Sequence, residues 1–516
     1  MNSAARSITA IMAITLLSKP LGLLREMIMA AQFGAGPSMD AYNMALGIAG
    51  VLPLLLLGYL NATYIPEYTH IRLKEGEAES SRFFNLVITL MAVLSLLISV
   101  SCFTFAPRVV GFFAPGFAGE TRAAAISIFR ILIWLTPLNI IIIVLSSTFN
   151  ARRKHILPVL AGTIINFTVI PSCLLLSPKI GIYSVVSGVC AGAVIQAVIL
   201  WLPCAGVTGR FRPVLEVRNR HIIKTVRLAV PAVAASATWQ ILELVNRSIS
   251  SGLPTGSVST LEYSNKLLAI CMPVFIVPLS TVFFSRASEF AATDDRKSTL
   301  SALWITIETG AAVAMPIIII TVFMRTEIVR MVYERGLFTP NDTAATAAVL
   351  QCLIFMLFMN AFESPLTYTL LAFQDMKNVV LRSAIKVCIC AGASIVLARY
   401  FGVVGIVLGT LWGEVVAIAM LFLTLRYRWG PLGMSRSLSE GGKMLICAAI
   451  CGFCLWGLRQ MLPSADGTVI MDLLRFGVAT LAGGAFFYGS ALLLKVRSVE
   501  NIYNLITDKL RQILTV

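Results

Sequence analysis

The sequence predicts an all-α, polytopic membrane protein. Hydrophobic residues make up 58% of the 516 residues and charged residues 13%, about half of their usual share in soluble proteins. Apolar runs of about 20 residues, the length that crosses the hydrocarbon core as a helix, recur along the whole chain. The strict alternation of apolar and polar residues that marks membrane strands is absent from these runs. The fold class to expect is therefore a bundle of membrane-spanning helices.

Fourteen apolar segments predict fourteen transmembrane helices. The first segment is expected to stay in the protein as a helix, because no small-residue cleavage site follows it. The predicted helices centre on residues 8–32, 40–65, 83–106, 123–149, 157–177, 181–203, 223–250, 258–285, 299–324, 343–373, 378–399, 402–426, 441–461 and 471–494.

Basic residues concentrate in every second connection between these segments, for example in "ARRKH", "GRFRPVLEVRNRHIIK" and "RYRWGPLGMSR". Because Lys and Arg accumulate in cytoplasmic loops, this distribution places both chain termini in the cytoplasm. It also accounts for the net charge of +16, so the charge does not indicate nucleic acid as a partner. The partners to expect are membrane lipids and a substrate carried by the membrane.

The eleven cysteines and three histidines form no recognisable metal or redox motif. Most cysteines lie within apolar segments, and the Cys451-x-x-Cys454 pair falls on a predicted membrane helix with no histidine nearby. We interpret these cysteines as small apolar core residues and expect no metal centre.

The chain also contains an internal repeat. "GFFAPGFAGET" matches "MVYERGLFTPNDT", and "TFNARRKHILPVL" matches "LAFQDMKNVVLRS", with a similar separation in the chain for both pairs. Two copies of six helices point the same way through a membrane, and such halves usually flank a central cavity. We therefore predict three parts: a first six-helix half at 1–210, a second at 211–430, and two added helices with a cytoplasmic tail at 431–516.

The first predicted helix carries charges that are costly inside a bilayer. Lys19 and Arg25 lie six residues apart, or about 120° around a regular helix, and Glu26 follows. Pro20 removes a backbone hydrogen bond, and Gly22 adds flexibility. We predict a bend or break at these two residues that turns both cations toward one cavity.

Helices seven and eight of the prediction repeat this pattern of embedded charge. Glu243 and Arg247 have the i, i+4 spacing of an intrahelical ion pair, and Glu262 and Lys266 have the same spacing. For the first pair, a purely structural ion pair is an equally good interpretation. The cations on helices one and eight predict a basic central cavity, whose natural guest is an amphipathic phosphate or diphosphate.

Asp40 follows the glycine-rich turn "FGAGPSMD" at the start of the second predicted helix. Either Ser38 or Asp40 is expected to cap that helix, because short polar side chains bind free amides at helix starts. Further charged residues lie within predicted helices, several of them near the ends, where Lys and Arg are interpreted as side chains that reach the interface. These further residues are Arg130, Glu308, Glu363, Lys386 and Glu414.

At this point a family resemblance becomes visible. "LSKPLGLLREMIMAAQFGAGPSMDAY", "YERGLFTPNDT" and "TLLAFQDMKNVVLRSAIKV" resemble three segments of the MurJ (MviN) family, within the multidrug/oligosaccharidyl-lipid/polysaccharide exporter superfamily. The resemblance covers essentially the whole chain. It implies a non-enzymatic flippase that moves lipid II, an undecaprenyl-diphosphate-linked peptidoglycan precursor, across the bacterial cytoplasmic (inner) membrane. It also implies that the last two helices form a groove for the lipid tail.

The resemblance assigns roles to individual residues. Lys19 and Arg25 fall on the two Arg of the family's first helix, and Lys266 falls on an Arg of its eighth helix; these cations would hold the diphosphate. Glu26 and Asp40 fall on family Asp positions. We place these two, together with Glu243, Glu262, Pro20 and Gly22, in a supporting or gating role.

The sequence departs from the family pattern in its second helix. The family carries an Arg pair there, whereas this chain reads "GVLPLLLLGYLNATYIP". Arg247 is outside the family pattern and is the candidate to supply the missing charge. Lys also replaces Arg at two positions, and a Lys point charge lacks the bidentate fork of Arg. Another polyprenyl-linked oligosaccharide, such as an exopolysaccharide repeat unit, therefore stays open as the cargo.

Three other functions are compatible with a polytopic chain. A cation-coupled drug exporter of the same superfamily predicts a cavity rich in acids and aromatics. A membrane glycosyltransferase needs a catalytic carboxylate on an outer loop, but Asp294 and Asp295 fall on a predicted cytoplasmic loop. A scaffold that keeps the fold without transport is the third. No nucleotide-binding G-x-x-x-x-G-K-[ST] motif occurs. Membrane potential is one physical source of energy for transport, and the resemblance implies Na⁺ as another. The protein is expected to act as a monomer.

Overall fold

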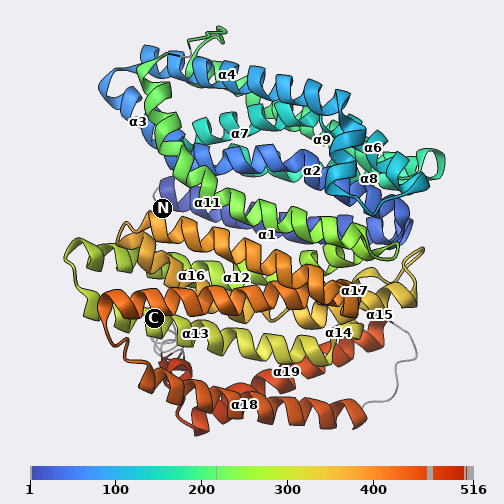
Figure 1. Cartoon of the computed structure of the whole chain (residues 1–516), viewed down its shortest axis with the longest axis vertical. Helices are drawn as coiled ribbons and strands as arrows, with labels where there is room; N and C mark the ends of the chain where they lie inside the picture. Colours follow the sequence, from blue (N-terminus) through green and yellow to red (C-terminus); the bar gives the residue numbers. More distant parts are fainter. Residues whose placement is uncertain (1–2, 217, 462–468, 502, 505–506, 508–516) are drawn as a thin grey trace. The chain divides into compact units, whose positions relative to one another are not determined.

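The computed structural model describes the chain except for residues 1–2, 217, 462–468, 502, 505–506 and 508–516. The described residues form helices joined by short connections, with no strand among them (Figure 1). They divide into two compact units: unit 1 is Met1–Ser259 with Arg335–Thr339, and unit 2 is Thr260–Glu334 with Pro340–Val516. The predicted loop "LPSADGT" and most of the predicted C-terminal tail lie outside the described residues.

Unit 1 is built from long helices joined by short ones. A five-residue π-helix, Leu60–Tyr64, continues α2 directly into α3, and a short 3-10 helix, Leu202–Cys204, follows α9. The α-helices of this unit are α1 (Ser3–Phe33), α2 (Pro37–Tyr59), α3 (Ile65–Lys74), α4 (Glu77–Thr104), α5 (Ala106–Phe113), α6 (Gly119–Leu132), α7 (Leu135–Ala151), α8 (Ile156–Ile180), α9 (Tyr183–Trp201), α10 (Ala205–Thr208) and α11 (Arg220–Ser251).

Unit 2 contains the remaining helices, although the first three residues of α12 belong to unit 1. Its longest helix, α17, holds two helical segments that meet at Gly402, where φ is 58°. The helices are α12 (Ser257–Ala292), α13 (Arg296–Phe323), α14 (Arg325–Tyr333), α15 (Pro340–Leu353), α16 (Met356–Ala372), α17 (Met376–Trp429), α18 (Met434–Met461) and α19 (Val469–Leu493).

The membrane class predicted from composition is confirmed. Among the described residues, 10 helices are long and apolar enough to cross a membrane, and the pair α6 and α7, bent by 43°, raises the number to 11. The helices α1 and α11 also cover predicted spans, but they are not among these candidates. The chain is therefore an all-helical, multi-pass membrane protein.

The predicted repeat reappears in the helix boundaries. α6 begins at Gly119 and ends at Leu132, whereas α15 begins at Pro340 and ends at Leu353, so both ends are shifted along the chain by the same amount. We call this shift the repeat offset. α7 and α16 are related by it at both ends. Even the turns that follow agree, since Arg153 and Gln374, separated by the repeat offset, both have positive φ.

Two helical hairpins in these repeats depend on glycine. Gly188 and Gly192 of α9 lie so close to α8 that a Cβ atom at either position would overlap it. Gly409 and Gly413, which the repeat offset relates to these two, lie equally close to the first segment of α17. Small residues spaced four apart allow helix backbones to approach in this way. The two halves of α17 thus form an antiparallel hairpin, as the two separate predicted spans require.

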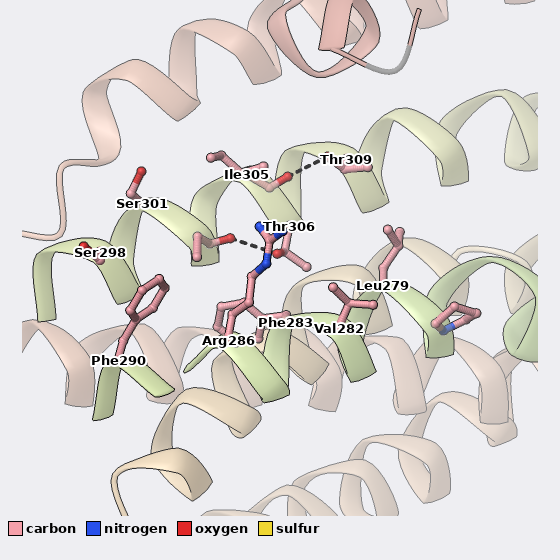
Figure 2. A pocket seen from close by; sticks show the side chains of 12 residues that line it. Leu279, Val282, Phe283, Arg286, Phe290, Ser298, Ser301, Ile305, Thr306 and Thr309 are labelled. Atoms are coloured by element: carbon pink, nitrogen blue, oxygen red, sulfur yellow. Dashed lines mark hydrogen bonds between the residues drawn. The ribbon is translucent and has the colours of Figure 1, made fainter. Parts of the chain in front are cut away.

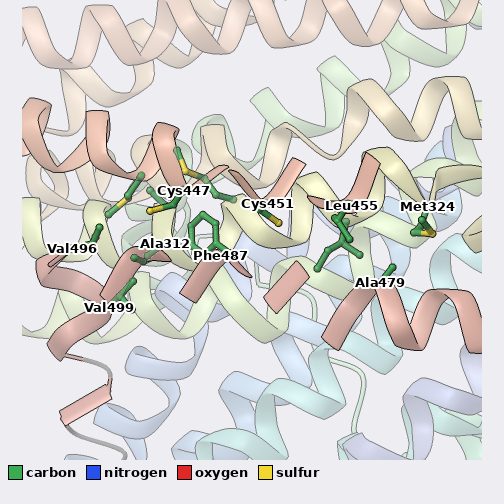
Figure 3. Packing of buried hydrophobic residues seen from close by; sticks show 14 residues of the cluster. Ala312, Met324, Cys447, Cys451, Leu455, Ala479, Phe487, Val496 and Val499 are labelled. Carbon is green, nitrogen blue, oxygen red and sulfur yellow. The ribbon is translucent and has the colours of Figure 1, made fainter. Parts of the chain in front are cut away.

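The added helices α18 and α19 lie side by side and pack on α13 (Figure 1). Their shared core holds Phe487, Leu455, Ala312, Cys447 and Cys451, all fully buried (Figure 3). Cys451 thus acts as a small apolar residue, as the sequence predicted. This packing places the last two helices in unit 2.

A charged network joins the start of α11 to α3, and its carboxylate, Glu67, lies outside the predicted membrane spans. Glu67 on α3 accepts a hydrogen bond from Lys224 at 2.6 Å and interacts with Nδ1 of His221 at 2.8 Å. Burial disfavours the charged form of Glu67, but these two partners outweigh it and hold the pKa of Glu67 below its usual value. The network fixes the start of α11 within unit 1.

Replacing Gly409 by Ala should destabilise the protein. The new Cβ would overlap backbone atoms of Ser394, and overpacking of this kind costs about 1–3 kcal/mol. Gly392 lies on the same helix with no atom near its Cβ position, so Gly392→Ala should be neutral or stabilising by up to about 1 kcal/mol. Thermal unfolding of both variants in detergent measures the difference; equal midpoints would contradict the close packing.

The Glu67 network should contribute stability that depends on pH. Because the folded-state pKa of Glu67 is lowered, its contribution is fully present above the unfolded value near 4.5 and is lost as pH falls through the folded value. Glu67→Gln should therefore lower the unfolding temperature at neutral pH and reduce its fall on acidification. Glu120→Gln, at an exposed carboxylate, is the control and should leave the pH profile unchanged.

Candidate functional site

The first helix keeps its charges without a break. α1 continues as a helix through Pro20 and Gly22, in contrast to the predicted break. In apolar surroundings an interrupted helix would leave several backbone groups unsatisfied, which favours continuation. Lys19 is exposed, whereas the Arg25 guanidinium donates to Glu26 at 2.7 Å and Glu26 is only 6% exposed.

A cavity lies between α2 and α11, both in unit 1. Its volume is about 300 Å³, and the charged residues that line it are Arg247 and Glu243, joined by a hydrogen bond of 2.5 Å. The remaining lining residues are Leu46, Gly47, Gly50, Val51, Leu54, Gln240 and Leu244. This i, i+4 pair is the one that the sequence predicted.

The cavity also shows how Arg247 reaches α2. Its guanidinium lies so close to the backbone at Gly47 that any side chain there would overlap it. α2 carries no Lys or Arg of its own within Pro37–Tyr59. The glycine therefore allows a cation from α11 to stand at the surface of a helix that has none.

Lys266 lies on α12 in unit 2, above the ring of Tyr263 at 5.5 Å. Tyr263 is fully buried against Tyr333, with ring centroids 4.8 Å apart, and the Tyr333 hydroxyl donates to the Tyr263 carbonyl at 3.2 Å. A cation above an aromatic face is stabilised by the ring quadrupole. Glu262, on the same turn, is 8% exposed.

The predicted diphosphate-binding set is thus divided between the units. Lys19, Arg25 and Arg247 belong to unit 1, and Lys266 belongs to unit 2. Each cation lies on a helix that the sequence assigned to the membrane. Their joint action on one ligand stays a prediction.

Asp40 has a different role from the predicted cap of its own helix. The residue before α2 is Gly36, and no side chain caps that helix. The carboxylate of Asp40 instead accepts bonds from the backbone amides of Gly256 (2.6 Å) and Ser259 (2.7 Å) and from the Ser259 hydroxyl (2.6 Å). Asp40 therefore caps the first turn of α12, far along the chain, where the free amides and the helix dipole favour an anion.

The turns around this cap are packed through glycine backbones. Gly256, with φ at 92°, lies against the carbonyl of Ala35, and Gly336, with φ at 58°, lies against the carbonyl of Ala31. Leu337 donates its amide to that same Ala31 carbonyl at 2.8 Å. These positions accept only glycine, because a Cβ atom would meet backbone and the positive φ would be strained.

Unit 2 holds a buried charge cluster that the sequence did not assemble. Lys386 lies 2.7 Å from Glu363 and 2.6 Å from Glu414, and it is only 7% exposed. The interpretation that Lys386 reaches the membrane interface is therefore wrong. The sequence did contain a signal for this cluster, because all three charged residues stand where the first half of the repeat has apolar residues.

A second cavity of about 480 Å³ lies between α12 and α13. Figure 2 shows Arg286 extending from α12 toward Thr306. The hydroxyls of Thr306 and Thr309 donate to carbonyls of their own helix. Arg286 is the charged residue among those that line this cavity. The sequence missed this residue because α12 runs to Ala292, beyond the predicted end of the span.

Comparison with known proteins decides the family. The model of the family "Lipid II flippase MurJ" matches residues 29–474. The chain belongs to the MurJ family. Among its relatives, a probable lipid II flippase MurJ from Synechocystis sp. is 26% identical over 506 residues, which cover 92% of this chain and 94% of the relative. The resemblance found in the sequence is thereby confirmed.

Solved structures agree with the MurJ assignment at the level of the fold. A lipid II flippase MurJ in an inward closed conformation matches with a TM-score of 0.78 at 21% identity, covering 93% of this chain and 99% of that structure. An inward-facing multidrug resistance transporter of the MATE family, in the MOP superfamily, matches with a TM-score of 0.66 at 13% identity, covering 83% and 99%. These likenesses show that the chain has the MurJ fold over most of its length.

Replacing Asp40 by Ala should destabilise the start of α12. Loss of a capping side chain costs about 0.5–2 kcal/mol, and here two amides and a hydroxyl lose their acceptor together. Ser38→Ala is the matched control, because Ser38 is exposed and makes no cap bond. Hydrogen exchange at Gly256 and Ser259 should accelerate in the first variant and not in the second; unchanged exchange in both would refute the role given to Asp40.

Proposed function

We propose that this chain is a flippase that translocates lipid II, the undecaprenyl-diphosphate-linked peptidoglycan precursor, across the bacterial cytoplasmic membrane by alternating access. The observation that carries the proposal is the set of cations on apolar helices of a MurJ-family chain: Lys19 and Arg25 on α1, Arg247 beside α2, and Lys266 on α12. Cations embedded among apolar helices select an anionic ligand.

The chemistry of these side chains suits a diphosphate on a lipid carrier. Lys and Arg make charge-assisted hydrogen bonds to phosphate oxygens, each contributing about 1.5–3 kcal/mol. The apolar lining beside Arg247 suits the isoprenoid chain next to the head group. Glu26 and Glu243 hold two of the cations in place, and Asp40 caps the start of α12. We propose a supporting role for the buried Glu262 as well.

The architecture that we propose has fourteen membrane spans, with both termini in the cytoplasm. The common repeat offset between α6 and α15 and between α7 and α16 supports two six-helix halves, at 1–210 and 211–430. Helices α18 and α19, in the added part at 431–516, would form the groove for the lipid tail. Halves repeated in this way rock about a central cavity.

The protein is proposed to work as a monomer without catalysis. Moving a head group across the membrane needs no covalent chemistry, and we propose that a gradient supplies the energy. Membrane potential acts on any charge that moves with the cavity, at about 2.3 kcal/mol per charge per 100 mV. A cation gradient is the other source that we propose to test, with Na⁺ as one candidate ion.

A second cargo, an exopolysaccharide repeat unit on the same diphosphate carrier, is favoured by two departures from the family pattern. α2 lacks a cation of its own, and Lys19 and Lys266 stand where the resemblance expects Arg. A point charge places fewer geometric demands on the head group than a bidentate guanidinium. The carrier diphosphate is common to both cargoes, so the sugar is what the experiment has to distinguish.

Complementation of a bacterium depleted of its own MurJ tests the function. The wild-type chain should restore growth, and Lys19→Ala, Arg25→Ala, Arg247→Ala and Lys266→Ala should each abolish or strongly reduce rescue. Loss of one charge-assisted bond weakens head-group binding about 10- to 100-fold. Exopolysaccharide export is scored in parallel in the same strains.

Arg130→Ala is the matched control for these variants. Arg130 is an exposed cation on α6 that lies above Phe103, so its loss should not affect rescue. Protein levels in the membrane are measured for every variant. Full rescue by all four cation variants, at normal levels, would overturn the proposed function, and export of exopolysaccharide without rescue would replace the cargo.

A further inference from the structure

The cluster of Glu363, Lys386 and Glu414 lies within the helices of unit 2. Glu363 comes from α16, Lys386 from the first segment of α17, and Glu414 from the second. The ammonium group lies between the carboxylates, 2.7 Å from Oε1 of Glu363 and 2.6 Å from Oε1 of Glu414. Neither the predicted diphosphate site nor the added helices use these residues.

The cluster has one more anion than it has cations. Two carboxylates and one ammonium leave a net charge of −1 if all three groups are ionised. Glu414 has no exposed surface, and no hydrogen bond reaches its Oε2 atom. An uncompensated charge buried in this way costs several kcal/mol, so a further positive charge is needed.

The fold itself does not need these three charges. The repeat offset places Ile142, Ile165 and Ala193 of unit 1 at the positions of Glu363, Lys386 and Glu414. The first half thus builds the same helix pair and hairpin with apolar residues. Because buried ion pairs are often replaced by apolar residues without loss of stability, a structural role is a weak explanation for the cluster.

A proton can supply the missing positive charge of this cluster better than a metal ion can. Hard metal cations take several oxygen ligands, but Lys386 already occupies the place between the two carboxylates. Among the described residues, no group of three or more His, Cys, Asp or Glu side chains is arranged to hold a metal. A proton needs only the unused oxygen of Glu414.

Other titratable groups near Glu414 are thiols. Cys390, on the first segment of α17, lies directly against the helix turn that carries Glu414. From α15, which also packs on α17, Cys352 contributes to the apolar cluster at the start of the second segment. Glu363 and Lys386 are therefore the charged groups that face Glu414 among the described residues.

We propose that Glu363, Lys386 and Glu414 form a proton site, in which Lys386 acts as a built-in cation and Glu414 binds and releases one proton during transport. This inference rests on the proposed flippase function and names its coupling ion. With the proton bound, the site holds one carboxylic acid, one carboxylate and one ammonium and is neutral. On release, the O–H bond of Glu414 breaks, the proton passes to water, and the site keeps a charge of −1.

Glu363 gives this site its connection to water. Its side chain is 22% exposed, compared with 9% for Lys386 and 0% for Glu414. Movement that separates α16 from α17 would let water reach Glu414 past Glu363, and the deprotonated carboxylate would then be hydrated. Proton release is thus tied to an opening between these two helices.

Titration of the purified protein, without lipid II, tests the site directly. Infrared spectra recorded across a pH series should show, in addition to the signals of the exposed carboxylates, the carbonyl stretch of one buried protonated carboxyl group that disappears as pH rises. Glu414→Gln should remove this signal. Glu308→Gln should keep it, since the buried Glu308 carboxylate accepts a hydrogen bond from Ser437 at 2.6 Å and is already satisfied.

Two outcomes of the titration would overturn the proposal. One is a set of titrating carboxyl signals that is the same in the wild type and in Glu414→Gln, and the other is a Glu308→Gln spectrum that has lost the signal assigned to Glu414. Because lipid II is absent, neither outcome bears on the flippase function. Conversely, failure of the wild-type chain to rescue a MurJ-depleted cell would remove the function and leave the titration result standing.

Transport by the chain in vesicles tests the coupling. A triple variant with Glu363→Ile, Lys386→Ile and Glu414→Ala copies the apolar residues of the first half and should fold with unchanged helix content. With one proton per cycle, a gradient of one pH unit should change the accumulation ratio of flipped lipid by about tenfold in the wild type. The gradient should have no effect in the triple variant. A response to Na⁺ in place of pH, or a pH response that persists in the triple variant, would overturn the proposal.

Discussion

A charge inside an apolar helix bundle is stable only beside a partner, and this constraint organises the protein. Arg25 is held by Glu26 on the same turn, and Arg247 by Glu243 one turn away. Lys386 is shared by carboxylates from two other helical segments. In each case the carboxylate holds the cation at a defined position on its helix.

The same constraint determines where glycine is needed. A guanidinium can lie against α2 only because Gly47 has no side chain, and the hairpins of α8–α9 and α17 close only because their glycines let two backbones touch. Close backbone approach also brings buried carboxylates and ammonium groups within bonding distance across helices. The close packing of the helices is therefore a condition for the ion pairs between them.

Much of the fold could be predicted from the sequence, because the bilayer imposes a length and an apolar composition on each helix. The repeat was visible from short sequence matches, and the helix boundaries of α6, α7, α15 and α16 fit one offset. The π-helix Leu60–Tyr64 and the continuous path through Pro20 were not visible, since both depend on how backbone hydrogen bonds are satisfied in place.

The candidate site was predicted less completely, because sequence spacing describes one helix at a time. The Arg25–Glu26 and Arg247–Glu243 pairs were accessible, as each lies on a single helix. The cluster around Lys386 and the capping of α12 by Asp40 join residues that are distant in the chain, which spacing cannot connect. For the same reason, the sequence predicted no contact among Glu363, Lys386 and Glu414.

The Asp40 cap has a kinetic consequence. One carboxylate serves two amides and one hydroxyl, so a shift that breaks one bond misplaces the acceptor for the other two. Separation of the α1–α2 turn from the first turn of α12 would therefore be all-or-none, with a barrier set by three simultaneous losses. A shared acceptor of this kind would favour two arrangements of the turns, bonded or separated, over intermediate ones.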